Sequence, residues 1–477
     1  MKPGGMRGRI LRGIGAGMVG QALNIVGRLL MVPLFLAAWG VQAYGEWLIL
    51  SSAAAWLALG DLGGQVYFVN RLTAEWAQGA RDAFERTLST GFLLFLLVPG
   101  GLFALFALFA LAAPLGQWMG LVSTLPEVVR SVLLLLALQV AVALPQGLLF
   151  GIYRAIGAQA TSIMLGNAIL GMQLAASGGV LLLGGGMVAM AIVQILPTLV
   201  VTAWAIFDLR VRLPGVCLFT HTLVDVELAR QSFRPSLQFL GIQLAQALVI
   251  QGSVLTIGRT LGAAEVVMFS TVRTLVNLAK QVLGLMSHSA WPEFTRLEAA
   301  REKMRLCLLF KTVLRISLLA TVVYMTVVEV VGQELLNRWL GGRLPYDATV
   351  MRLFSLYILL NVFWTLAGNV LMATNRHAAL ARGQIVIAAL AIALCYVGAK
   401  YWGVSGAVAG LIIGEALPLC LIVPYLLVRQ KVGVSAGLLT REALLFAATA
   451  LLIFASPPAA LAVCALIGLQ TRKGMAG

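Results

Sequence analysis

SVLLLLALQVAVALPQGLLFGI, residues 131–152, carries no charged side chain. A helix of this length can cross the ~30 Å hydrocarbon core of a bilayer, which needs about 20 apolar residues. Similar runs recur along the whole chain, in which 60% of the 477 residues are hydrophobic and 11% are charged. Soluble domains carry about 25% charged residues, so no soluble core accounts for this composition. The sequence therefore predicts an all-α polytopic membrane protein.

The apolar runs predict two lobes of six spans each. The predicted organisation is an N-terminal six-helix lobe at 1–207, a cytoplasmic linker at 208–235, a C-terminal six-helix lobe at 236–428, and a C-terminal transmembrane hairpin and tail at 429–477. The predicted spans are 14–38, 43–69, 87–113, 130–152, 158–183, 186–207, 236–259, 265–289, 307–332, 349–373, 379–400 and 403–428.

The distribution of basic residues orients these spans. Most of the 34 Lys and Arg residues fall in alternate segments, beginning with the N-terminus. The positive-inside rule places these segments in the cytoplasm. The stretch 443–470 contains Pro457 and Pro458 and reads as one kinked span or a hairpin of two. A single span would put Arg472 and Lys473 outside, so the rule favours the hairpin, about 14 spans in total, and both termini in the cytoplasm.

A weak internal repeat relates the two halves at an offset of 221 to 222 residues. An even number of spans per half gives both halves the same orientation, with an axis along the membrane normal. This arrangement predicts a cleft between two rocking lobes. Asp225, Glu227 and Arg230, in the predicted linker, read as a solvated face. The matched positions are Trp118 and Trp339, Gly120 and Gly341, Arg154 and Arg376, Pro197 and Pro418, and Gln21 and Asn24 with Gln243 and Gln246.

Sequence motifs for catalysis and metal binding are absent. The chain has no GxxxxGK[ST], HExxH or GxSxG motif, its five cysteines show no CxxC spacing, and its three histidines are far apart. We therefore expect no catalytic residue, no metal and no cofactor, and we expect a transporter rather than an enzyme. Basic residues spread over alternate loops, with a net charge of +16, also argue against nucleic-acid binding.

Two predicted spans carry polar stripes that a lipid-facing helix would not expose. Inserting a charged side chain at the bilayer centre costs about 2.5–3.5 kcal/mol, so each such charge is expected to be hydrated, paired with an opposite charge or required for function. One interpretation is that the stripes snorkel or pair with acids. The other, which we prefer, is a cationic cleft that binds an anionic substrate. The stripes consist of Gln21, Asn24 and Arg28 in the first span and Arg273, Asn277 and Lys280 in the eighth.

Two carboxylates lie deep in predicted spans. Asp61 stands in LALGDLGG of the second span and Glu415 in IIGEALP of the twelfth. The repeat places Gln194 opposite Glu415, so this carboxylate is present in one half only. Both are candidates for binding a coupling ion, H⁺ or Na⁺. For Asp61, a local cap at a helix break is an equally weighted alternative.

Four other charged residues are assigned to the ends of spans. Lys311 and Arg315 lie near the inner end of the ninth span, where long basic side chains snorkel to the interface. Glu46 and Glu329 lie near the outer interface and are expected to be solvated.

GVQAYGEWLILSSAAAWLALGDLGGQVYFVNRL, residues 40–72, has Y-G-x-W at the start of the second span, D-L-G near its middle and N-R-L at its inner end. This pattern resembles the polysaccharide-exporter branch of the multidrug/oligosaccharidyl-lipid/polysaccharide (MOP) flippase superfamily, which includes O-antigen flippases. The resemblance implies a protein of the bacterial inner membrane that moves a polyprenyl-pyrophosphate-linked oligosaccharide from the inner to the outer leaflet.

The resemblance also implies roles for particular residues and partners. Arg28, Arg273 and Lys280 match, by position and charge type, the basic cavity residues thought to receive the pyrophosphate. A proton or Na⁺ gradient would suit Glu415 or Asp61. The implied partners are the lipid-linked glycan, membrane lipids and a glycan polymerase or glycosyltransferase machinery.

Three other functions are alternatives to this one. A multidrug exporter of the same superfamily takes organic cations, for which acidic and aromatic cavity residues are expected. A major-facilitator carrier has a characteristic motif between its second and third spans, whereas this segment reads RLTAEWAQGARDAFERT, residues 71–87. A membrane glycan polymerase or ligase would bring a large outer loop, and the predicted outer loops are short.

Overall fold

The computed structural model describes residues 6–61, 63–216, 220, 223–373, 378–429, 437–442, 444 and 448. All regular secondary structure in this part is helical, and nine helical stretches in it are long and apolar enough to cross a membrane. The prediction of an all-α polytopic membrane protein is thereby confirmed. The predicted hairpin at 443–470 lies almost wholly outside the described residues. The chain divides into two compact units, Met1–Ala247 and Leu248–Gly477.

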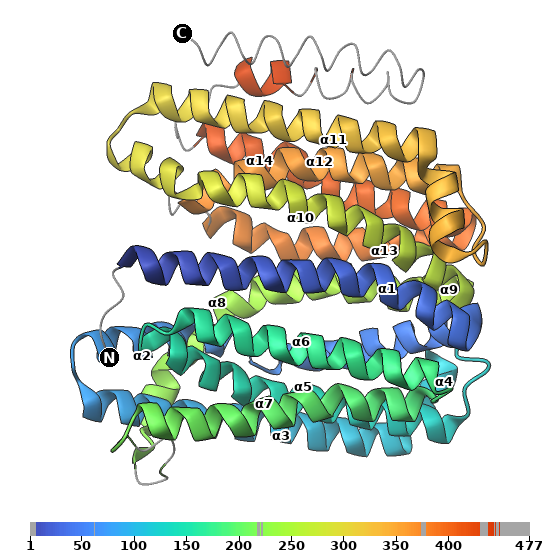
Figure 1. The fold of residues 1–477 in the computed structure, drawn as a ribbon. Coiled ribbons are helices and arrows are strands. Elements are labelled where there is room, and N and C mark those ends of the chain that lie inside the picture. Colours follow the sequence, from blue (N-terminus) through green and yellow to red (C-terminus); the bar gives the residue numbers. More distant parts are fainter. Residues whose placement is uncertain are drawn as a thin grey trace. The chain divides into compact units, whose positions relative to one another are not determined.

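The first unit is a helical bundle in which α1 packs on α6, and α5 packs on α3 and α7 (Figure 1). Its hydrophobic core buries Phe68, Phe84, Leu148 and Tyr153 between α2, α3, α5 and α7. The elements are α1 (Met6–Ala55), η1 (Trp56–Asp61, 3₁₀), α2 (Gly64–Ala77), α3 (Arg81–Ala112), α4 (Leu115–Trp118), α5 (Pro126–Ala155), α6 (Gln159–Leu182), α7 (Met187–Arg212) and α8 (Val226–Ala247).

The second unit begins inside the predicted seventh span. Its helices α10, α11 and α12 pack together, α13 packs on α9, and α14 packs on α12 (Figure 1). The elements are η3 (Leu248–Gly252, π), α9 (Ser253–Leu261), α10 (Ala263–Ala299), α11 (Lys303–Leu340), α12 (Ala348–Ala373), α13 (Ala378–Leu411), η4 (Ile412–Ala416, π) and α14 (Leu417–Arg429).

Glycines with positive φ separate consecutive spans at matching positions in the two units. Gly40 (φ 72, ψ 179) joins the first two spans inside α1, and Gly262 (φ 99, ψ 175), at the repeat offset, joins α9 to α10. This region of backbone conformation is essentially open only to glycine. The matched Gly120 and Gly341 also share a positive φ, 73° and 62°. Two pairs of positions related by the repeat offset therefore share a left-handed backbone conformation.

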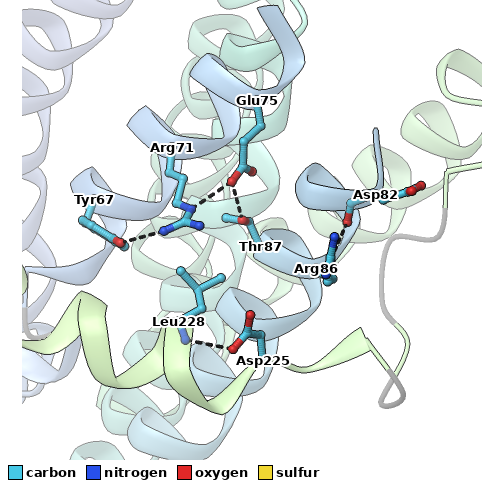
Figure 2. Close-up of polar contacts among 8 residues, drawn as sticks. All are labelled: Tyr67, Arg71, Glu75, Asp82, Arg86, Thr87, Asp225 and Leu228. Carbon is cyan, nitrogen blue, oxygen red and sulfur yellow. Dashed lines mark hydrogen bonds and ion pairs between the residues drawn. The ribbon is translucent and has the colours of Figure 1, made fainter. Parts of the chain in front are cut away.

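Asp225, directly before α8, is bonded to α3 and to the first turn of α8, and Figure 2 shows the second of these contacts. The Asp225 N–H donates to Thr90 Oγ1 at 2.9 Å, and Asp225 Oδ1 accepts the Leu228 N–H at 2.9 Å. Asp225 thus caps α8, because its carboxylate satisfies an otherwise unpaired N–H of the first turn. The expectation of a solvated face was wrong for Asp225, whereas Glu227 and Arg230 are exposed.

Candidate functional site

Glu415, Tyr357 and Lys280 meet inside the second unit, from η4, α12 and α10. The Tyr357 hydroxyl donates to Glu415 Oε2 at 2.6 Å. Lys280 Nζ lies 5.1 Å from the centre of the Tyr357 ring, and its charge interacts with that of Glu415 without a direct ion pair. All three side chains are half-buried. Three residues that are 58 or more positions apart in the sequence therefore form one cluster of two charged groups and a hydroxyl.

The π-helical turn η4 carries Glu415 and is fixed by close backbone packing. A Cβ atom added at Gly414 would lie 2.4 Å from Ala391 Cα, and one added at Gly410 would lie 2.3 Å from the Leu394 carbonyl oxygen. Small residues let these helical segments approach backbone to backbone, as at many membrane helix interfaces. Single π turns in α-helices often occur at functional sites. The glycines therefore place the Glu415 carboxylate on a rigid support.

Arg273 bonds to the other π-helical turn, η3. Its Nη1 donates to the Ile250 carbonyl at 2.9 Å and to Ser253 Oγ at 3.1 Å. The guanidinium also lies 4.9 Å from the centre of the Phe269 ring, within cation–π distance. Asn277, one helical turn after Arg273, is half-buried on α10. Arg273 and Lys280 thus place two cations on α10, and the charge of Lys280 interacts with that of Glu415.

The polar stripe of the first unit is less tightly paired. Asn24 Nδ2 donates to the Gly20 carbonyl at 3.0 Å, one turn earlier in α1. Gln21 and Arg28 are half-buried. Among the described residues, no carboxylate forms an ion pair with Arg28. Arg28 therefore contributes a half-buried positive charge that forms no ion pair within the described part of the chain.

Asp61 ends a helix. It is 9% exposed, and its Oδ1 accepts the Gly63 N–H at 2.8 Å. It also accepts a hydrogen bond from the Gln243 side chain of α8. The predicted second span is interrupted here, because η1 ends at Asp61 and Gly63 adopts a φ of 73° before α2 begins. This is the geometry of a local cap at a helix break, with a second partner, Gln243, on α8.

Arg315 was predicted to snorkel to the interface, and this prediction is wrong. It forms a buried, two-pronged ion pair with Glu442, in which Nη2 to Oε1 is 2.8 Å and Nε to Oε1 is 3.1 Å. The side chains are 7% and 0% exposed. The sequence pattern missed Glu442, because it treated the segment after α14 as a loop. The pair ties α11 to the residues that precede the predicted hairpin.

Glu46 is buried rather than solvated. It has no exposed surface, and its carboxylate accepts hydrogen bonds from the N–H groups of Val122 and Ser123 at 2.9 and 2.8 Å. The Thr124 hydroxyl and the Gln42 amide also donate to it. The four donors stabilise the ionised carboxylate. Three of them belong to the loop before α5, so their hydrogen bonds hold this loop against α1. Among the described residues, no group of three or more His, Cys, Asp or Glu side chains is placed to hold a metal ion.

Structural comparison finds transporters with this fold. The chain resembles a multidrug resistance MATE family transporter of the MOP superfamily in an inward-facing conformation, with a TM-score of 0.69 and 14% identity over 88% of this chain and 98% of the other. It resembles the lipid II flippase MurJ in an inward closed conformation, with a TM-score of 0.70 and 11% identity over 97% and 98% of the two chains.

A third match is a MOP superfamily transporter from Pyrococcus furiosus, described by the reverse polarity of its binding pocket, with a TM-score of 0.54 and 13% identity over 89% and 94% of the two chains. No protein-family model and no curated protein sequence matches the chain. The chain has the fold of the transporters of the MOP superfamily.

Proposed function

We propose that the protein translocates an anionic lipid-linked oligosaccharide, a polyprenyl-pyrophosphate glycan, from the inner to the outer leaflet of the bacterial inner membrane. The observation that carries the proposal is the pair of cations on α10 of the C-terminal unit. Lys280 lies over the ring of Tyr357, whose hydroxyl donates to Glu415, and Arg273 is held at the π-helical turn η3. Arg28 supplies a further unbalanced cation in the N-terminal unit. The fold adds support, since a lipid flippase shares it.

The chemistry of the substrate explains why cations are needed. A pyrophosphate diester carries two negative charges, and moving them through the hydrocarbon without counter-charges costs several kcal/mol per charge. Arg273 can supply planar N–H donors, and Lys280 a compact ammonium. The polyprenyl chain is apolar and can remain among the lipids. Alternating access then requires only that the headgroup pass through the protein.

Coupling to an ion gradient is part of the proposal and rests on the place of Glu415. Lys280 is its cationic neighbour, and Tyr357 donates to it. When Lys280 turns to the pyrophosphate, Glu415 loses the nearby positive charge and gains affinity for H⁺ or Na⁺. Binding of the substrate at Lys280 would thus favour binding of the coupling ion at Glu415. Asp61 is engaged in its helix break, so Glu415 is the residue we assign to coupling.

A second candidate function is the export of organic cations by a multidrug transporter of the same fold. The favouring observation is the acid and aromatic pair of Glu415 and Tyr357, which is the chemistry a cation would require. Efflux of ethidium from vesicles separates this candidate from the first. Cation efflux without lipid translocation would replace the proposal.

The direct test is reconstitution in liposomes with a fluorescent polyprenyl-pyrophosphate oligosaccharide, scored by the fraction accessible to a membrane-impermeant quencher. Lys280→Met and Arg28→Gln each remove a charge, and we expect translocation to fall roughly 10- to 100-fold, since hydrogen bonds to charged groups contribute about 1.5–3 kcal/mol. Arg259→Gln, at an exposed position of α9, is the matched control and should translocate normally. Full activity of both test variants would refute the role of these cations.

A further inference from the structure

A hollow of about 260 Å³ lies between the ends of α10 and α11 that adjoin their connecting turn. Its lining shares no residue with the cluster of Glu415, Tyr357 and Lys280. Its lining mixes two arginines with apolar side chains, a composition suited to a ligand with a charged head and an apolar body. The lining residues are Glu293, Arg296, Leu297, Arg305, Leu308, Leu309 and Thr312.

The two arginines retain donors for a ligand. Arg296 donates through Nε and Nη2 to Glu293, and Arg305 through Nη1 to Glu302, each within its own helix. The Arg296 and Arg305 side chains are 72% and 74% exposed, and exposed pairs of this kind are weak. The remaining N–H groups of each guanidinium lie outside these pairs. An anion can therefore bind without breaking them.

The turn beside the hollow places more positive charge there in a strained conformation. Arg301 has a φ of 59°, the only positive φ of a non-glycine residue in the part of the chain that the structure describes. Glycine or asparagine is the usual choice for this conformation, because other side chains crowd the backbone. Arg301 and Lys303, two residues later, are exposed, so packing does not require an arginine. A negatively charged ligand beside the turn would account for an arginine, rather than a glycine, at position 301.

We propose that this hollow binds an anionic phospholipid of the surrounding bilayer. Its phosphate would lie between Arg296 and Arg305, and an acyl chain would follow Leu308, which is 52% exposed. The positive-inside pattern predicts that this turn lies at the cytoplasmic headgroup level, where basic pockets between membrane helices bind anionic lipids. The apolar lining favours a lipid over a soluble phosphate. The site does not depend on what the protein transports.

The test counts phospholipids retained by the purified full-length protein in neutral detergent, using native mass spectrometry with phosphatidylglycerol or phosphatidylcholine. We expect preferential retention of phosphatidylglycerol. The double variant Arg296→Gln/Arg305→Gln should weaken it about 30-fold, because each basic residue near an anionic lipid contributes roughly fivefold. Arg338→Gln is the matched control, since Arg338 pairs with Glu334 within α11 and is 80% exposed. This control should retain the lipid like the intact protein.

A second variant tests the site without the risk that the first variant misfolds. Arg301→Gly relieves the strained φ while removing one charge, so it should fold at least as well and bind phosphatidylglycerol about fivefold more weakly. Equal retention of the two phospholipids would overturn the proposal, as would an equal loss in Arg338→Gln. Displacement of phosphatidylglycerol by an equal concentration of inorganic phosphate would also overturn it, because the apolar lining would then play no part.

Discussion

Replacing Glu442 by glutamine removes one charge of a buried ion pair and leaves the other. Arg315 and Glu442 are 7% and 0% exposed, and two nitrogens of the guanidinium donate to the carboxylate. The glutamine side chain has the same length but no negative charge. Its amide nitrogen would also face a donor. The Arg315 charge would then be buried without compensation.

The expected cost is large for a single substitution. Removing one partner of a buried pair costs about 3–5 kcal/mol. The unit that holds the pair spans Leu248–Gly477. For domains of 150–250 residues, each kcal/mol lowers the unfolding midpoint by about 2–4 °C, so Glu442→Gln should lower it by roughly 6–20 °C. The double variant Arg315→Met/Glu442→Leu removes both charges and should recover most of this loss, because apolar replacements of buried pairs are often neutral.

The assay is the unfolding midpoint of the purified protein in one detergent at one heating rate. Glu334→Gln breaks the exposed pair of Glu334 with Arg338 on the same helix and is the control, expected to cost less than about 1 kcal/mol. A shift for Glu442→Gln no larger than that of the control would refute the reasoning. A double variant as unstable as the single one would show that shape, rather than charge, holds the segment.

Three further outcomes follow from the same geometry. Glu46→Gln should cost about 2 kcal/mol and speed limited proteolysis of the loop before α5, since the charged acceptor of four donors is lost; unchanged proteolysis would contradict this. Gly40→Ala should lower the free energy of unfolding by about 1–3 kcal/mol, while Gly13→Ala, inside α1 where an added Cβ meets nothing within 4 Å, should be neutral or stabilising by up to about 1 kcal/mol; equal effects of the two would contradict the strain at Gly40. Tyr357→Phe should slow lipid translocation roughly tenfold in liposomes by removing the donor to Glu415; normal rates would exclude the hydroxyl.

The spans could be predicted because the bilayer acts on local sequence. A run such as 131–152 has one stable solution in hydrocarbon, a helix of matching length, whatever its neighbours are. The repeat was also visible, because matched glycines and tryptophans mark the ends of spans. The breaks were harder to locate. The 3₁₀ turn that ends at Asp61 and the π turn around Glu415 arise from packing against other helices, which apolar run length does not encode.

The contacts of the charged residues were decided by the tertiary structure. Helical periodicity placed Arg273, Asn277 and Lys280 on one face of α10, but it gave no information about which helix lies opposite. Tyr357 was missed, since one tyrosine in an apolar span carries no distinctive signal.

The sequence by itself determined the class, the spans, the repeat and the presence of buried charge, all of which depend on the length and composition of single segments. Only the tertiary structure decided which charges are paired. Arg315 and Glu442, or Glu46 and the loop before α5, are brought together by helices whose packing depends on the shapes of many side chains at once. The cost of burying a charge predicts that a partner or water exists, and only the fold identifies it.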